Sequence, residues 1–341
     1  MGNLCARGIG GSHAPTTYDD HVQITSPRQR PATRPPTPGQ SPLYELGRRP
    51  VPPSPGSSTS TDKYVSLSNT HDPRLDSLSA RRRNGQVIQV SAATFDMMSL
   101  SHDILLKTAY ETFPDGPGNQ AANVWMSGGR NWMRKEMCRS SVDERASQDQ
   151  QVKAIKETGG GNCGEYAKMV LAEFQRHQRN QPVFKVLESN EHSLVIVGDW
   201  RAPETGDHAI VVDPWQGLKK VHTYGERSIT TRPFITATQE KGGPIRPPAK
   251  LKAAFALKPV SDETVDAEIR EKSDFGSSGP RYARAVLRNN NAVMFDRIAG
   301  TENLHTVYRD PNGRESAFNS LPPSYLESYL NGRDAIVKEF T

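Results

Sequence analysis

The stretch Thr158-Gly-Gly-Gly-Asn-Cys-Gly-Glu-Tyr-Ala167 decides how the rest of the chain is interpreted, because it brings a cysteine to the start of a helix. A thiol at that position lies beside unpaired backbone N–H groups and the positive end of the helix dipole, which favours its thiolate. The glycines before it are expected to let the backbone turn sharply and a substrate chain approach. The pattern predicts Cys163 as a nucleophile, and a small buried structural cysteine is the alternative.

Helical periodicity surrounds this stretch on both sides. Behind Cys163, apolar residues recur at helical spacing at Tyr166, Ala167, Val170, Leu171 and Phe174. Before it, the patterns predict helices over Ser101–Tyr110, capped by Ser101, over Ala121–Cys138, interrupted at Gly128-Gly129, and over Gln148–Thr158. Cys138 is expected to be a core residue.

The periodicity then changes from helical to alternating. Three short runs rich in β-branched residues predict antiparallel strands over Val183–Glu188, Ser193–Gly198 and Ala209–Val212. A helix followed by antiparallel strands predicts the α+β class. Further helices are expected near Ser261–Arg270, Pro280–Leu287 and Pro323–Leu330, packed around the sheet.

The strands carry residues that suit a thiol nucleophile. A catalytic cysteine needs a base within hydrogen-bond reach, and the base needs a third group to fix its tautomer. We expect His192 to be the base and Asp213 to orient it, with His208 as the rival base. The backbone N–H of Cys163 is the expected first oxyanion donor. Two supporting residues are also predicted, namely Asn162 as a candidate second donor and Trp215 packed beside the site.

Composition excludes several function classes. The net charge of +5 comes from basic residues scattered along the chain, which argues against a nucleic-acid surface. No apolar run is long enough to span a bilayer. Three widely spaced cysteines argue against a disulfide scaffold and a Cys-rich zinc site. No phosphate-binding loop or metal-ligand spacing is present, so we expect neither a cofactor nor a metal.

The first 86 residues have a different composition from the remainder. Met1-Gly-Asn-Leu-Cys-Ala-Arg7 fits a lipidation signal, with Gly2 as myristate acceptor and Cys5 as palmitate acceptor. Two acyl chains give a stable membrane anchor, whereas one binds marginally. The Pro-, Ser- and Arg-rich residues that follow bury too little apolar surface to offset their ordering entropy. We therefore expect residues 1–86 to be a disordered leader.

The motif Gly161-Asn-Cys-Gly-Glu-Tyr-Ala, the strand after His192 and the strand ending Val212-Asp-Pro-Trp215 resemble the transglutaminase-like cysteine superfamily. That resemblance covers about Gln150–Trp215 and implies a papain-like core, in which a helix carrying the cysteine packs on an antiparallel sheet carrying the histidine and aspartate. With the acylation signal and the leader, the whole chain resembles the AvrPphE/HopX/XopE family of type III effectors from plant-pathogenic bacteria.

The effector resemblance implies secretion into a plant cell, acylation there, and suppression of immunity at the host plasma membrane. Its expected partners are a host protein substrate, the host membrane and a secretion chaperone. Residues 87–341 would form the catalytic domain, divided into a helical family-specific recognition element (87–147), the Cys-His-Asp core (148–230) and peripheral helices (231–341).

The reaction type stays open at this point. A protease, a deamidase and a transglutaminase all pass through a thioester, and they differ in whether water or an amine resolves it. A catalytically idle scaffold that is tethered to the membrane and binds host proteins is the alternative from a different functional class.

Overall fold

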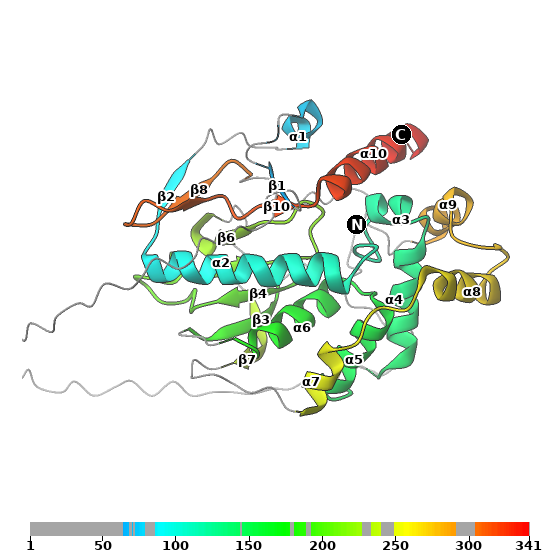
Figure 1. Ribbon diagram of the computed structural model, residues 1–341, viewed down its shortest axis with the longest axis horizontal. Coiled ribbons are helices and arrows are strands. Elements are labelled where there is room, and N and C mark those ends of the chain that lie inside the picture. The colour runs from blue at the N-terminus through cyan, green and yellow to red at the C-terminus, as the bar shows by residue number, and fades with distance from the viewer. Residues whose placement is uncertain are drawn as a thin grey trace, which may run out of the picture. The chain divides into compact units, whose positions relative to one another are not determined.

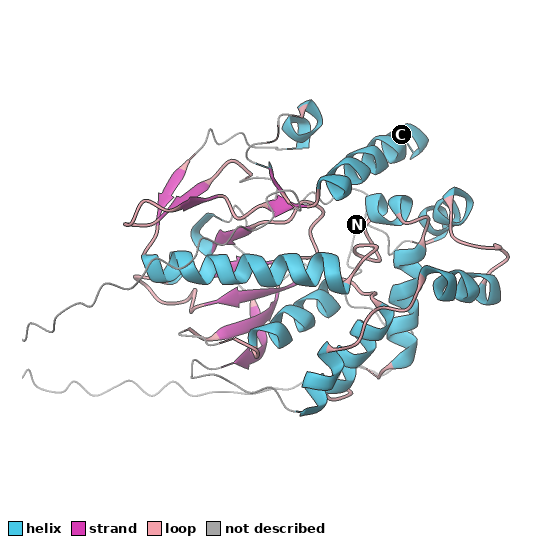
Figure 2. Cartoon of the chain, in the orientation of Figure 1, coloured by secondary structure: helices cyan, strands magenta, loops and turns pink. Residues whose placement is uncertain are grey.

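The computed structural model describes residues 64–67, 70, 72–78, 86–143, 145–177, 181–188, 192–226, 233–239, 249–290 and 304–340, all of which belong to one compact unit. Most helices and strands occur in separate runs along these residues, and most strand pairs are antiparallel (Figure 2). The α+β class predicted from the sequence is therefore confirmed.

A five-stranded sheet forms the centre of the unit. Its strands are β3 (Val183–Leu187), β4 (Ser193–Val197), β5 (Ile210–Val212), β6 (Val221–Thr223) and β7 (Phe234–Gln239). They lie in the order β6-β5-β4-β3-β7, and every neighbouring pair is antiparallel. Strands β3, β4 and β5 are those expected from the alternating pattern, and each lies within one residue of its expected ends.

Two helices pack on one face of this sheet, namely α2 (Ala92–Lys107) and α6 (Cys163–Phe174) (Figure 1). The apolar stripe of α6, including Val170 and Phe174, joins the strand residues Val183 and Val195 in one buried cluster. Residues one position along, such as Phe184 and Ile196, belong to a second buried cluster on the opposite face. The sheet is buried on both faces, which explains the near-continuous apolar sequence of β4.

The helices before Cys163 match the expected regions with one error. Helix α2 begins at Ala92 with Ser91 as its N-cap, whose side chain accepts from the Thr94 backbone N–H at 3.0 Å. Ser101 is buried in the middle of this helix, so its prediction as the cap was wrong. The expected start was wrong because Ser91, ten residues before Ser101, caps the helix ahead of buried apolar residues such as Phe95 and Met98.

The rest of the helical region follows the expected division. A π-helical turn (Thr108–Thr112) ends α2, and α3 (Ala121–Met126) and α4 (Arg130–Ser141) are separated at Gly128 and Gly129, which both have positive φ. Helix α5 (Gln148–Thr158) is the helix predicted to lead into the glycine run. Cys138 is a buried residue of α4, as expected.

The C-terminal region supplies more than peripheral helices. Helices α7 (Ala249–Phe255), α8 (Asp262–Lys272), α9 (Pro280–Asn289) and α10 (Pro323–Phe340) occur there. However, β7 completes the central sheet, and β8 (Val307–Arg309), β9 (Glu315–Ser316) and β10 (Ser320–Leu321) form further sheets with N-terminal strands. The expectation that residues 231–341 are only peripheral helices was therefore wrong, because edge pairing across the chain is not encoded in local periodicity.

Part of the expected leader is folded onto this unit. Strand β1 (Val65–Ser66) pairs antiparallel with β10, and β2 (Val87–Gln89) pairs parallel with β8. Helix α1 (Pro73–Leu78) lies between them and brings Leu75 into a core cluster together with Leu67. The expected boundary at residue 86 was therefore placed too late. The lipidation residues Gly2 and Cys5 lie outside the described residues.

Within the described ranges, no helix combines the length and the apolar character needed to cross a bilayer.

Candidate active site

The central sheet brings the predicted base and its partner to one edge. His192 immediately precedes β4 and Asp213 immediately follows β5. In the antiparallel register Val195 lies opposite Val212, so the start of β4 and the end of β5 are neighbours. The pairing of β4 with β5 therefore brings His192 and Asp213 together although they are far apart in sequence.

The imidazole of His192 contacts both other members of the predicted triad. Its Nε2 lies 2.5 Å from Oδ2 of Asp213. The Cys163 side chain also interacts with this imidazole and favours its charged form. The structure thus brings the three residues of the predicted triad, Cys163, His192 and Asp213, to one place.

The electrostatics of the site favour a charged imidazole. His192 and Asp213 are both buried. Burial alone would lower the pKa of His192, but the Asp213 carboxylate and the Cys163 thiolate outweigh it and raise that pKa to about 10. An imidazolium that is stable near neutral pH can hold the proton of the thiol, so the arrangement supports a thiolate–imidazolium pair.

The carboxylate of Asp213 is itself held in place by the residues that follow it. Its Oδ1 accepts from the Trp215 backbone N–H at 3.2 Å, and its Oδ2 accepts from Nε2 of Gln216 at 3.0 Å. The ring of Trp215 lies beside the His192 ring with centroids 4.9 Å apart. Trp215 is therefore packed against the base, where the sequence placed it, and it restricts the orientation of the imidazole.

Sequence reasoning missed two polar residues that hold Trp215 in place. Oδ1 of Asn119 accepts from the indole N–H of Trp215 at 3.0 Å, and Nε2 of Gln120 donates to the Trp215 carbonyl at 2.6 Å. Both residues are buried, and they lie in the connection between the π-helical turn and α3. The only local signal was an Asn-Gln pair after a Pro- and Gly-rich turn, which is common in ordinary loops.

Asn162 has a structural role at the start of α6. It is the N-cap residue, and its backbone N–H donates to Oε2 of Glu165 at 2.8 Å, as in a capping box. That backbone N–H is therefore not available to a substrate oxyanion. Burial would raise the pKa of Glu165, but Arg139 and the Asn162 N–H outweigh it and hold that pKa below its usual range.

The glycines before Cys163 face protein, which corrects the expectation that they leave space for substrate. Gly159 has a φ of +66° and ends α5, so it does make the sharp turn. A Cβ at Gly160 would lie 2.1 Å from the Arg134 carbonyl carbon, and one at Gly161 would lie 2.4 Å from Cβ of Glu165. These two glycines allow the loop to pack closely against α4 and α6.

A buried arginine fixes the same loop from the other side. The Arg134 guanidinium pairs with Asp115 at 2.6 Å and with Asp262 at 2.8 Å. It also donates to the backbone carbonyls of Thr158 and Val260, both at 2.9 Å. Arg134 thereby joins the end of α5 to the segments around Asp115 and Asp262, and it fixes the start of the glycine run that leads to Cys163.

A buried lysine, Lys219, interacts electrostatically with the Asp213 carboxylate. Lys219 is fully buried, and its ammonium donates to the Gln216 carbonyl at 2.7 Å. The rings of Tyr325 and Tyr110 lie 5.1 and 5.5 Å from it. Burial lowers the pKa of Lys219 to about 7, against an opposing attraction to Asp213. When charged, Lys219 favours the ionised form of Asp213.

The rival histidine does not reach this site. His208 ends a short 3₁₀ turn (Gly206–His208) and its side chain is exposed. This turn precedes β5, whereas Asp213 follows it, so the two residues lie at opposite ends of the strand. His192, and not His208, is therefore the histidine that contacts Asp213.

Among the described residues, no group of three or more His, Cys, Asp or Glu side chains could hold a metal ion. The arrangement of thiol, imidazole and carboxylate suits nucleophilic attack on a carbonyl followed by proton transfer.

Comparison with known proteins gave no match to any family model, curated protein or solved structure.

Proposed function

We propose that this protein is a thiol acyl-transfer enzyme of the transglutaminase-like superfamily that acts on a protein amide. The observation that carries the proposal is the position of His192, whose Nε2 lies 2.5 Å from the Asp213 carboxylate and whose charged form is also favoured by the neighbouring Cys163 side chain. The order of the three residues along the chain and the packing of the cysteine helix against the antiparallel sheet also support a papain-like core.

The proposed reaction has two stages. The Cys163 thiolate attacks the amide carbonyl, and a C–S bond forms. The His192 imidazolium then gives its proton to the departing nitrogen as the C–N bond breaks, which leaves a thioester and a neutral imidazole. Water or an amine next attacks the thioester while His192 takes its proton, and the C–S bond breaks to regenerate the thiolate–imidazolium pair. Asp213 holds the imidazole through both stages.

Water as the second nucleophile gives a protease or a deamidase, and an amine gives a transglutaminase. The backbone N–H of Cys163 remains the first oxyanion donor in this proposal, because it lies at the start of α6 where helix N–H groups have no intrahelical partner.

The biological setting that we propose rests on the sequence resemblance. In this proposal the protein is a secreted virulence effector of the AvrPphE/HopX/XopE type, which acts on a host protein at the plant plasma membrane. Myristate on Gly2 and palmitate on Cys5 would give the two acyl chains that stable anchoring requires.

The decisive experiment is to trap the acyl-enzyme. The full chain is incubated with a plant membrane extract and quenched in acid, and the Cys163 peptide is examined by mass spectrometry. We expect added mass from a host fragment on Cys163 and none on Cys138, the second cysteine of the catalytic region. Cys163→Ala should abolish both the adduct and the effect in plant cells. Cys138→Ala is the matched control and should retain both.

One observation favours the scaffold alternative, namely that Cys163 is only 1% exposed. A scaffold predicts that Cys163→Ala keeps the full effect in plant cells, which would contradict the enzyme proposal. Membrane attachment is tested separately, because Gly2→Ala should move the protein from the membrane fraction to the soluble fraction. Unchanged partition would contradict the acylation proposal and leave the catalytic one intact.

A further inference from the structure

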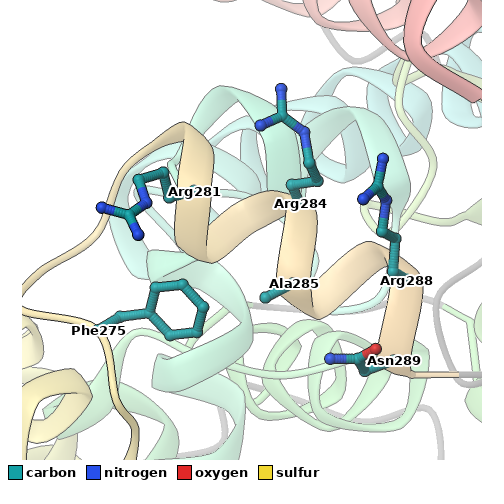
Figure 3. A pocket seen from close by; sticks show the side chains of 6 residues that line it. All are labelled: Phe275, Arg281, Arg284, Ala285, Arg288 and Asn289. Atoms are coloured by element: carbon teal, nitrogen blue, oxygen red, sulfur yellow. The ribbon is translucent and has the colours of Figure 1, made fainter.

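A cavity with an unusual concentration of arginine lies on helix α9, apart from the candidate active site. It has a volume of about 330 Å³, and its lining consists of Phe275, Arg281, Arg284, Ala285, Arg288 and Asn289. Figure 3 shows the three arginines on successive turns of the helix, with the Phe275 ring beside Arg281. No acidic side chain is among these lining residues. We call this feature the arginine cavity.

Two of the arginines are held in place before any ligand arrives. Nε of Arg284 lies 2.7 Å from Oε1 of Glu339 on α10, and Nη2 of Arg288 lies 3.4 Å from the same oxygen. The Arg284 guanidinium also lies 5.9 Å from the centre of the Trp125 ring, and that of Arg288 lies 5.9 Å from the Phe340 ring. These contacts reduce the side-chain entropy that a ligand would otherwise have to remove.

The charge of the cavity is not neutralised by these contacts. Glu339 supplies one negative charge to two arginines. Arg281 is exposed, and the part of the chain that the structure describes contains no salt bridge to it. Three guanidinium groups with one carboxylate therefore leave a net positive charge in a recess, where the field on an anion is stronger than at a flat surface.

The chemistry of these donors favours phosphate. Guanidinium groups present planar forks of N–H donors that match phosphate oxygens in pairs, and three of them line this cavity. A cavity of about 330 Å³ is at the small end of ligand sites, which suits a phosphate with a compact substituent. The half-buried Phe275 ring offers an apolar wall for that substituent.

We infer that the arginine cavity binds a phosphate monoester, with Arg281, Arg284 and Arg288 holding the phosphate and Phe275 contacting the group attached to it. The phosphate monoester is carried either by a soluble metabolite or by the lipid phosphatidic acid, since both end in the same phosphate group. This inference does not depend on the proposed reaction at Cys163.

The test is calorimetric titration of the unacylated full chain with phenyl phosphate and with inorganic phosphate. We expect saturable binding of both, tighter for phenyl phosphate, and weakening as salt rises. Arg281→Gln should weaken binding about tenfold, because it removes one charge-assisted contact. Arg281 is exposed and forms no salt bridge with the described residues, so this variant should unfold at the wild-type temperature. Phe275→Ala should remove the preference for phenyl phosphate while inorganic phosphate still binds.

The matched control is Arg201→Gln. Arg201 is an exposed arginine on the turn after β4 and pairs with Asp199, so its loss changes the net charge by the same amount at another place. It should leave phosphate affinity unchanged. Absence of saturable binding, equal affinity in wild type and Arg281→Gln, or an equal loss in Arg201→Gln would each overturn the inference.

The source of the phosphate is distinguished with vesicles. Sedimentation with phosphatidylcholine vesicles that contain phosphatidic acid, reversed by phenyl phosphate and lost in Arg281→Gln, would identify a lipid headgroup as the ligand. Binding of phenyl phosphate without sedimentation would identify a soluble phosphate. Displacement of phenyl phosphate by polyglutamate at the same concentration of charge would show a general anion surface and overturn the phosphate assignment.

Discussion

Nε2 of His192 and Oδ2 of Asp213 lie 2.5 Å apart across the adjoining ends of β4 and β5. This contact fixes the orientation of the imidazole, which also interacts with the Cys163 side chain at the start of α6. The pairing depends on strand register, because a slip of one residue would turn His192 to the other face of the sheet.

Asp213→Asn should weaken this link and destabilise the fold in a pH-dependent way. The pKa of His192 is raised in the folded state, to about 10, so the stabilisation due to its protonation is fully present below its unfolded pKa. That stabilisation is lost as the pH rises from about 6.5 towards 10. We expect the variant to lose about 1–3 kcal/mol of unfolding free energy at pH 6 and less at pH 9. Urea unfolding at both values measures this, and a loss that is larger at pH 9 would contradict it.

The alkylation rates of the two buried cysteines should differ. Burial raises the pKa of Cys138 to about 12, so its thiol is protonated at pH 7 and slow to react. Cys163 has an imidazolium beside it and should react with iodoacetamide faster than Cys138. In His192→Ala we expect at least a tenfold slower reaction at Cys163, with Cys138 unchanged. Peptide mass spectrometry over time provides both rates, and equal slow rates in wild type would count against a thiolate at Cys163.

Two glycines that flank Cys163 should respond in opposite ways to the same substitution. A Cβ at Gly160 would meet the backbone of Arg134 and Lys135 at 2.1–2.4 Å, so Gly160→Ala must displace the loop or α4. We expect a loss of more than about 2 kcal/mol. Gly164, in the first turn of α6, has nothing within 4 Å of an added Cβ, so Gly164→Ala should be neutral or stabilising by up to about 1 kcal/mol. Thermal unfolding of both variants provides the comparison, and similar melting temperatures would argue against the close packing of the loop.

Lys219→Met should change how stability depends on pH. Burial lowers the pKa of Lys219 to about 7, so the wild type carries an unfavourable buried charge below that pH. This penalty on the stability of the wild type decreases as the pH rises from about 7 to the unfolded pKa of about 10.5. We expect the variant to be the more stable protein at pH 6 and to lose that advantage by pH 10. Denaturant unfolding over this range tests the sign, and a constant difference would mean that the pKa of Lys219 is the same in the folded and unfolded states.

Much of the framework could be predicted from local sequence. The apolar stripe behind Cys163 predicts α6 because an amphipathic helix must bury one face. The β-branched runs predict β3, β4 and β5 because alternating side chains fit a pleated sheet. The position of His192 before one strand and Asp213 after the next one followed from these boundaries, and an antiparallel pair then brings them together.

The sequence by itself determined the elements that carry the three chemical groups, since short-range periodicity and turn residues act within a few positions. Only the tertiary structure decided what surrounds them. Gln120 supports Trp215 from 95 positions away, and Arg134 reaches Asp262 across 128 positions. The arginine cavity depends on Glu339 of another helix. Such contacts are set by how helices and sheets pack, and packing joins residues whose separation along the chain has no periodic signal.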